Sequence, residues 1–163
     1  MKSLVVYYSH YGNTAKVIHK IFEYLRQLGE AQLNRLEYLE GKSNPLKRLI
    51  FKIFPNLVEL APIPIDLSEY DLLCIGIPVL GGLPSSIISK YLRVCKSIDK
   101  KKIICCYVYG FEINAKGCSD YVKKLLTKKE NPDIIEMFMS WSEISKPNYV
   151  DNKIKEALAK VST

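Results

Sequence analysis

The amino-acid sequence predicts an α/β fold, a doubly wound domain in which helices cover both faces of an open, mostly parallel five-stranded sheet. Short apolar runs alternate with segments of helical periodicity along most of the chain. The run Leu72–Ile77 is almost entirely apolar, as expected of a strand buried on both faces. With 163 residues, of which 48% are hydrophobic, the chain has the size of one domain with a proper core. We therefore predict a single domain spanning residues 1–163.

Strand and helix patterns follow one another from the N-terminus. The first strand is expected at Leu4–Tyr8, and the helix after it is expected to end near Gly29, because glycine commonly follows a helix. The weaker strand pattern at Ala31–Leu36 is typical of a sheet edge. The later elements are expected as a strand at Leu72–Ile77, a helix after Ser85 or Ser86, a strand at Lys102–Tyr109, a helix at Ser119–Leu126, a strand at Ile134–Met139 and a helix at Asn152–Val161. This alternation makes the strands parallel, with their carboxyl ends at one edge of the sheet.

A polar loop joins the first strand to the first helix. It consists of Ser9, His10, Tyr11, Gly12, Asn13 and Thr14. The unpaired N–H groups and the positive dipole end of a helix N-terminus favour an anion, and two hydroxyl groups add donors. The loop lacks the lysine of a nucleoside-triphosphate loop and the three glycines of a dinucleotide fingerprint. The pattern predicts a site for a monophosphate, with a plain turn capped by Thr14 as the alternative.

Two further loops follow the third and fourth predicted strands. They begin with Pro78, Val79, Leu80, Gly81 and Gly82 after the third strand, and with Tyr109, Gly110 and Phe111 after the fourth. Adjacent glycines allow a flat ligand to approach the backbone closely. Ligands of open α/β sheets bind outside the carboxyl ends of the strands. We therefore expect the three loops to converge on one site.

Two of these segments resemble the flavodoxin family. The first loop is similar to the family's phosphate loop, S/T-x-T-G-N-T, with Tyr11 at the position where threonine is commonest. Residues 70–84, YDLLCIGIPVLGGLP, are similar to the more specific block Y-D-x-[apolar]-G-x-P-V-[aromatic]-x-G-x-P of bacterial and archaeal flavodoxin-like proteins, with Leu80 at the aromatic position. The resemblance covers the chain apart from about residues 41–64. It implies a flavodoxin-like fold with strand order 2-1-3-4-5 and FMN as the cofactor.

The resemblance also implies roles for individual residues. The phosphate is expected to be held by Ser9, Tyr11, Gly12, Asn13 and Thr14. Residues 78–82 are expected to line one side of the isoalloxazine ring and residues 109–111 the other. His10 either adds charge near the phosphate or faces solvent. Because Leu80 has no aromatic ring, stacking on the flavin is expected from Tyr109 or Phe111.

Residues 41–64 form an insertion that the alternating pattern does not explain. Within it, residues 46–54 place apolar side chains on one helical face and Lys47, Arg48 and Lys52 on the other. A basic amphipathic helix of this kind either docks on its own domain or makes peripheral contact with an anionic membrane. The insertion is also a candidate interface for a homodimer.

Charge and composition narrow the classes of partner. The net charge is +7, whereas the familiar flavodoxin carriers are acidic, so we expect an acidic redox protein or a small-molecule acceptor as the partner. The lysines are dispersed without interleaved aromatic residues, and no nucleic-acid binding is expected. The chain begins with a strand pattern and contains no apolar run of about 20 residues, which predicts a cytoplasmic protein. Five cysteines without a C-x-x-C pair indicate neither a disulfide framework nor a metal site.

The sequence therefore predicts an FMN-binding redox protein that acts in electron transfer or in the FMN-dependent reduction of a small acceptor. It does not separate a non-enzymatic electron carrier from an NAD(P)H oxidoreductase. No side chain is expected to act as a catalytic residue, because the chemistry belongs to the flavin. The alternative is an interaction or membrane-peripheral module that keeps the fold but has lost or weakened FMN binding, as Tyr11 and Leu80 suggest.

Overall fold

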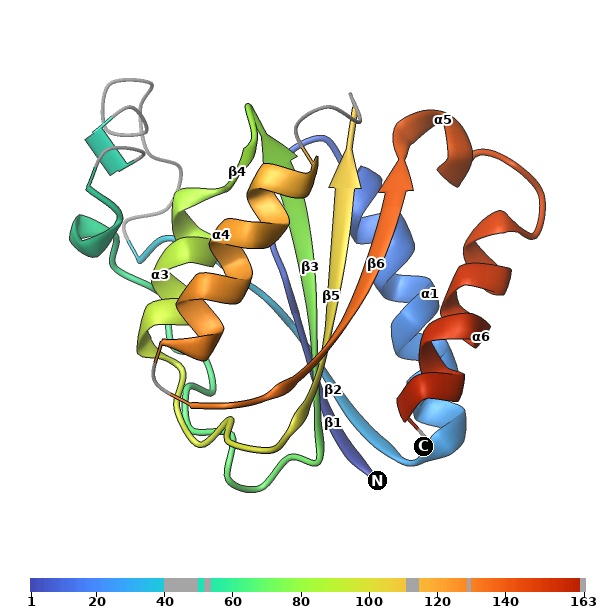
Figure 1. The fold of residues 1–163 in the computed structure, drawn as a ribbon, viewed down its shortest axis with the longest axis horizontal. Helices are drawn as coiled ribbons and strands as arrows, with labels where there is room; N and C mark the ends of the chain where they lie inside the picture. Colours follow the sequence, from blue (N-terminus) through green and yellow to red (C-terminus); the bar gives the residue numbers. More distant parts are fainter. Residues whose placement is uncertain (40–49, 52–53, 111–114, 129, 162–163) are drawn as a thin grey trace.

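The computed structural model describes residues 1–39, 50–51, 54–110, 115–128 and 130–161, and it consists of one sheet with helices on both faces (Figure 1). The strands are β1 (Lys2–Tyr7), β2 (Glu30–Arg35), β3 (Leu72–Leu80), β4 (Leu83–Pro84), β5 (Lys102–Tyr109) and β6 (Asp133–Ser140). The helices are α1 (Asn13–Leu28), the 3-10 turn η1 (Pro55–Leu57), α3 (Ser86–Val94), α4 (Ala115–Thr127), α5 (Trp141–Ile144) and α6 (Tyr149–Val161).

The five long strands are parallel and lie in the order β2-β1-β3-β5-β6. Counted along the chain as the sequence predicts them, this is the order 2-1-3-4-5, so the predicted fold class is confirmed. The short strand β4 is an addition, because it pairs antiparallel with the end of β3. The carboxyl end of β1 lies beside the middle of β3, since Tyr7 pairs with Gly76.

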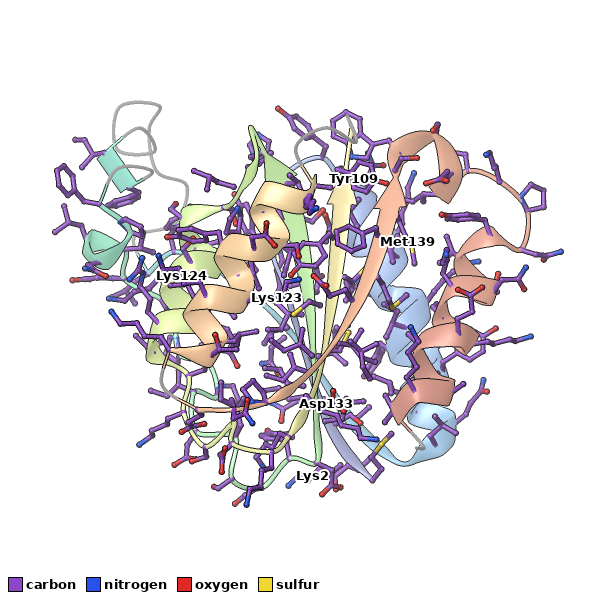
Figure 2. All side chains as sticks on the ribbon, viewed as in Figure 1. Lys2, Tyr109, Lys123, Lys124, Asp133 and Met139 are labelled. Atoms are coloured by element: carbon purple, nitrogen blue, oxygen red, sulfur yellow. The ribbon has the colours of Figure 1, made fainter. Side chains whose placement is uncertain are left out.

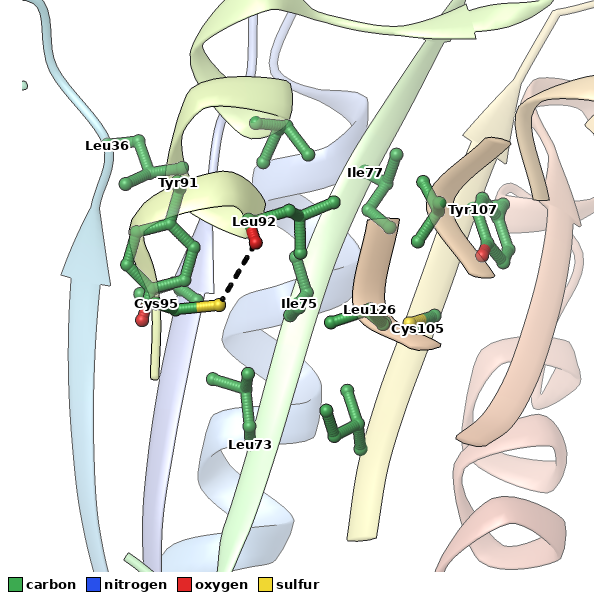
Figure 3. Packing of buried hydrophobic residues seen from close by; sticks show 14 of the residues in the cluster. Leu36, Leu73, Ile75, Ile77, Tyr91, Leu92, Cys95, Cys105, Tyr107 and Leu126 are labelled. Atoms are coloured by element: carbon green, nitrogen blue, oxygen red, sulfur yellow. Dashed lines mark hydrogen bonds between the residues drawn. The ribbon is translucent and has the colours of Figure 1, made fainter. Parts of the chain in front are cut away.

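Two separate cores lie on the two faces of the sheet. Helices α3 and α4 cover one face, and α1 and α6 cover the other (Figure 1). Alternate residues of each strand point to opposite faces, so Leu73 and Ile75 join Tyr91 of α3 in the first core, whereas Cys74 packs with Ile18 of α1 in the second (Figure 3 shows the first core). Both faces of β3 are covered, which explains its continuous apolar sequence.

Strand β3 is longer than the sequence predicts. It continues through Pro78, Val79 and Leu80, which were expected in a loop, and returns as β4 across a tight turn. The turn is formed by Gly81 and Gly82, whose φ angles of 62° and 80° lie in the left-handed region that favours glycine. Proline is tolerated at position 78 because β1 pairs with β3 only as far as Gly76, which leaves no β1 carbonyl for a residue-78 N–H.

Two helix boundaries and one additional helix also differ from the expectation. Helix α4 begins at Ala115 and α6 at Tyr149, both earlier than predicted, and α5 was not predicted. Helix α5 begins with a capping box, in which the Glu143 N–H donates to Ser140 Oγ and the Ser140 N–H donates to the Glu143 carboxylate. The Ser140 N–H and the Ser140 hydroxyl both donate to the Glu143 carboxylate, and these two hydrogen bonds lower the pKa of Glu143. The S-x-x-E motif of a capping box is present in the sequence at residues 140–143.

The insertion at 41–64 is described only in part. The basic helix expected at residues 46–54 lies largely outside the described residues, including Lys47, Arg48 and Lys52. Within the described part, the ring of Phe51 stacks on Tyr38 with ring centroids 5.8 Å apart. The 3-10 turn η1 contacts α3. The described end of the insertion therefore packs beside the α3 face of the sheet.

All five cysteines are free and buried. Burial raises the pKa of Cys106 and of Cys118 to about 12, so both remain protonated and unreactive at neutral pH. Among the described residues, no three His, Cys, Asp or Glu side chains are grouped so that they can hold a metal ion. None of the helices in the described part combines the length and apolarity needed to cross a bilayer.

Candidate functional site

The loop after β1 forms a compact N-terminal cap for α1. Gly12 occupies the N-cap position with φ 87° and ψ −20°, a left-handed conformation. The buried Ser9 Oγ accepts hydrogen bonds from the N–H groups of Gly12 (3.1 Å) and Ala15 (3.3 Å). Thr14 lies inside the first helical turn, so the alternative of a turn capped by Thr14 does not describe this loop.

The first turn of α1 keeps donors for an anion. In the described part of the chain, no acceptor lies against the N–H groups of Asn13 and Thr14. Thr14, which belongs to the same turn, is 3% exposed. The helix dipole adds positive potential at this end, and no acidic residue occupies the first turn. These features suit a phosphate group that is bound by neutral donors.

A narrow cleft lies beside this loop, at the carboxyl ends of the strands. It is lined by Ser9, His10, Tyr11, Asn13, Thr14, Pro78, Val79, Leu80, Val108 and Trp141, and we call it the phosphate-loop cleft. Residues of the first and second predicted loops therefore come together, as the topology requires. Among the described residues that line the cleft, none carries a carboxylate, ammonium or guanidinium group.

The enclosed volume of the phosphate-loop cleft is only about 10 Å³. Tyr11 forms one wall, and its side chain packs edge-on against the rings of His10 and Trp141, with centroids 4.5 Å and 6.1 Å away. Tyr11 is 69% exposed, so its side chain can rotate without disturbing the core. The donors are thus preformed, whereas the space beside them is small.

The other predicted residues that the structure describes do not line this cleft. Gly12 caps α1, Gly81 lines a neighbouring cavity, and Gly82 completes the hairpin turn. Tyr109, at the end of β5 (Figure 2), is 6% exposed and lines a different cavity beside α4, together with Lys116 and Phe138. Its ring belongs to the core on the α3 and α4 face. Phe111 lies outside the described residues.

Trp141 is a cleft residue that the sequence reasoning missed. It is the first residue of α5, directly after β6, and it is the single tryptophan of the chain. A Cβ added to Gly110 would approach the Trp141 ring to 3.1 Å, so the absence of a side chain at Gly110 leaves space for the indole. The useful signal was its position, because β6 ends at the same edge of the sheet as β1 and β3.

Comparisons with known proteins agree with this topology. No protein-family model and no curated protein sequence matches the chain. A putative flavoprotein from Bacteroides eggerthii DSM 20697 is 16% identical, with a TM-score of 0.74 over 99% of this chain and 98% of that chain.

Two further solved structures are similar along nearly their whole length. A flavoprotein in complex with FMN from Lactobacillus acidophilus NCFM is 21% identical, with a TM-score of 0.67 over 96% of this chain and 98% of that chain. The two-electron reduced flavodoxin of Megasphaera elsdenii is 17% identical, with a TM-score of 0.63 over 97% and 98% of the two chains. Likeness at these identities establishes the architecture, and the chain therefore has the flavodoxin-like fold.

Proposed function

We propose that this protein binds FMN in the phosphate-loop cleft and acts in electron transfer or in the reduction of a small acceptor. The observation that carries the proposal is the first turn of α1, where the N–H groups of Asn13 and Thr14 point to an anion site at the carboxyl edge of a flavodoxin-like sheet. The FMN complex of the similar Lactobacillus acidophilus flavoprotein supports the choice of ligand.

The described residues suit the parts of FMN. Asn13 and Thr14 supply donors for the phosphate, and the exposed rings of Tyr11 and Trp141 supply flat surfaces for the flavin. The β3–β4 hairpin exposes backbone around Gly81 that can approach the ring edge. When bound, FMN supplies one- and two-electron chemistry, and the protein positions it and sets its electrostatic surroundings.

Reduction of the FMN-loaded protein tests the redox function. The protein is reconstituted with FMN, separated from excess FMN and reduced anaerobically with dithionite, while the visible flavin absorption is followed. We expect full bleaching, and recovery of the absorption when a quinone is added. A bound FMN that dithionite does not reduce would contradict a redox role.

The same experiment distinguishes an electron carrier from an NAD(P)H-dependent reductase. NADPH or NADH replaces dithionite as the reductant, with free FMN as the control for direct reduction. Rapid bleaching of the bound flavin alone assigns an NAD(P)H oxidoreductase. Bleaching no faster than that of free FMN assigns a carrier that receives electrons from another protein.

We propose an acidic redox protein or an anionic small molecule as the partner, because the net charge is +7. Complementary charge accelerates association, and the rate then falls as ionic strength rises. Peripheral membrane contact through residues 46–54 and a homodimer through the insertion are further proposals about a segment that lies largely outside the described residues.

Trp141 provides a natural reporter of FMN binding. As the single tryptophan, it lies in the cleft and is 43% exposed, so we expect FMN to quench its fluorescence until one FMN is bound per chain. An aromatic pair contributes about 0.5–1.5 kcal/mol, so Trp141→Ala should weaken FMN binding by about 2–10-fold. Trp141→Phe keeps a ring and should lose less. Unchanged affinity of Trp141→Ala, measured by FMN fluorescence, would exclude a contact between the indole and the flavin.

A further inference from the structure

Helix α5 is a single turn of four residues that carries Trp141 to the phosphate-loop cleft. It begins directly after β6, at the carboxyl edge of the sheet (Figure 1). Ser140 is both the last residue of β6, where it pairs with Tyr109, and the N-cap of α5. The residues that follow this pair, Trp141 and Gly110, lie together, since a Cβ added to Gly110 would be 3.1 Å from the indole. The direction of this one turn therefore decides where the indole lies.

A helix as short as α5 needs support from the rest of the protein. The free-energy cost of forming the first helical turn is recovered only over a longer helix. The side chain of Ile144 gives one support, because it packs against the core on the α1 and α6 face of the sheet. The side chain of Glu143 gives another, through the capping box at the start of the helix.

The Glu143 carboxylate joins the end of β6 to the turn of α5. It accepts hydrogen bonds from the Ser140 N–H (3.1 Å) and from the Ser140 hydroxyl (2.8 Å). In return, the Glu143 N–H donates to Ser140 Oγ (3.3 Å). The carboxylate also acts on Tyr149, the first residue of α6, because burial and then the charge of Glu143 raise the pKa of Tyr149 to about 12. Glu143 thus lies where β6, α5 and α6 meet.

The charge of Glu143 strengthens this network. Hydrogen bonds to a carboxylate are roughly twice as strong as those between neutral groups. The two bonds from Ser140 lower the pKa of Glu143, so the carboxylate remains charged at neutral pH. The turn of α5 is therefore held in one geometry under ordinary conditions.

Glu143 acts on the cleft from a distance. It does not line the phosphate-loop cleft, whereas Trp141, two residues before it on the same turn, does. The indole packs edge-on against the ring of Tyr11 on the opposite wall, with centroids 6.1 Å apart. An effect of Glu143 on a ring bound in the cleft would thus pass through the position of the indole.

We propose that Glu143 is a positioning residue for the flavin, which fixes the turn of α5 so that the indole of Trp141 lies against the bound ring. The inference rests on the proposed binding of FMN in the phosphate-loop cleft. It concerns a residue that touches neither FMN nor the cleft, and it assigns the capping box a role in ligand binding as well as in folding.

The fluorescence of the FMN-free protein tests the placement of the indole. Trp141 is the single tryptophan, so the emission reports on this position alone. In Glu143→Ala, we expect emission at longer wavelength and stronger quenching by acrylamide, because the freed turn exposes the indole. Glu143→Gln should stay close to the wild type, since glutamine also completes a capping box. A residue that only stabilises the fold would lower the unfolding temperature and leave the quenching of the native protein unchanged.

Glu156→Ala is the matched control for the loss of a carboxylate. Glu156 lies on α6, forms an exposed ion pair with Lys153 and is not part of the capping box. Its replacement makes the same change in net charge as Glu143→Ala. It should leave both the acrylamide quenching and the affinity for FMN like those of the wild type.

Ligand affinity then tests whether Glu143 acts through the indole. Glu143→Ala should weaken FMN and riboflavin alike by about 2–10-fold, because the aromatic contact concerns the ring that both ligands share. In a Trp141→Ala background, Glu143→Ala should cause no further loss. Both affinities are measured by the quenching of ligand fluorescence.

The possible failures can be told apart. Unchanged acrylamide quenching in Glu143→Ala would overturn the placement of the indole by Glu143, whatever the affinity for FMN. Losses that add up in the double variant would overturn its action through Trp141. A wild-type protein that retains no FMN would overturn the proposed function, and the role of Glu143 in flavin binding with it.

Discussion

Replacing Asn13 by glutamate is expected to weaken FMN binding by at least about a hundredfold while the protein stays folded. Asn13 is the first residue of α1 and lines the phosphate-loop cleft. Two like charges about 4 Å apart repel by about 4 kcal/mol at an effective dielectric constant of about 20. Even after solvent screening reduces this value by a third, the remaining repulsion corresponds to about a hundredfold in affinity.

The same substitution should not harm the fold. A carboxylate in the first turn of a helix interacts favourably with the helix dipole, so the unfolding temperature of Asn13→Glu should equal or exceed that of the wild type. Asn152→Glu is the matched control, because Asn152 is exposed on α6 and does not line the cleft. It should bind FMN like the wild type.

Riboflavin is the control ligand that shows whether Asn13→Glu acts on the phosphate of FMN. It carries the same ring without the phosphate, so Asn13→Glu should affect riboflavin binding far less than FMN binding. Both affinities are measured by the quenching of ligand fluorescence. Equal loss of both ligands would point to a distorted cleft, and unchanged FMN affinity would place the phosphate elsewhere.

Substitution of Gly76 should have the largest effect on stability. Gly76 lies in the middle of β3, between Tyr7 of β1 and Cys106 of β5. A Cβ at this position would meet Ile18 of α1 and lie 2.8 Å from the Tyr7 Cβ. Helix α1 thus packs directly on the backbone of β3. We expect Gly76→Ala to lose about 1–3 kcal/mol of unfolding free energy and Gly76→Val to lose more.

Gly117→Ala is the control for this prediction. Gly117 lies inside α4, where an added Cβ would sit 3.7 Å from the Gly82 carbonyl oxygen, an ordinary contact. Alanine is the better helix former, so Gly117→Ala should gain up to about 1 kcal/mol. Urea denaturation measures both variants.

A double variant identifies the contact responsible. Ile18→Ala makes a cavity under α1, and the Cβ of Gly76→Ala partly fills it, so the double variant should lose less than the sum of the two single losses. Additive losses would mean that the two positions do not touch. A Gly76→Ala variant as stable as the wild type would contradict the close packing of α1 on β3.

The order of the sheet could be predicted because each strand carries its own pattern. The apolar run Leu72–Ile77 marks a strand with two buried faces, and the weaker pattern at Ala31–Leu36 marks an edge, which agrees with the positions of β3 and β2. The loop between β1 and α1 could be predicted for a similar reason, since a helix N-terminus that follows a buried strand has a recognisable sequence pattern. These signals are local in the sequence.

The missed features depend on contacts between distant segments. β3 extends to Leu80 because β4 returns against it, and its apolar pattern alone does not show where pairing stops. Trp141 reaches the cleft because β6 ends beside the other strands and Gly110 leaves space for the indole. Tyr109 is an exception, because strand alternation, which is a local pattern, already places it with Tyr107 on the α4 face.

The visible absorption spectrum of the purified protein tests the central claim most directly. The protein is incubated with FMN, passed through a desalting column and scanned, and the protein-to-flavin ratio is determined. We predict flavin bands that remain after desalting, with one FMN per chain, and their loss in Asn13→Glu but not in Asn152→Glu. A colourless protein that retains no FMN, although its fold is intact by circular dichroism, would contradict FMN binding at this loop.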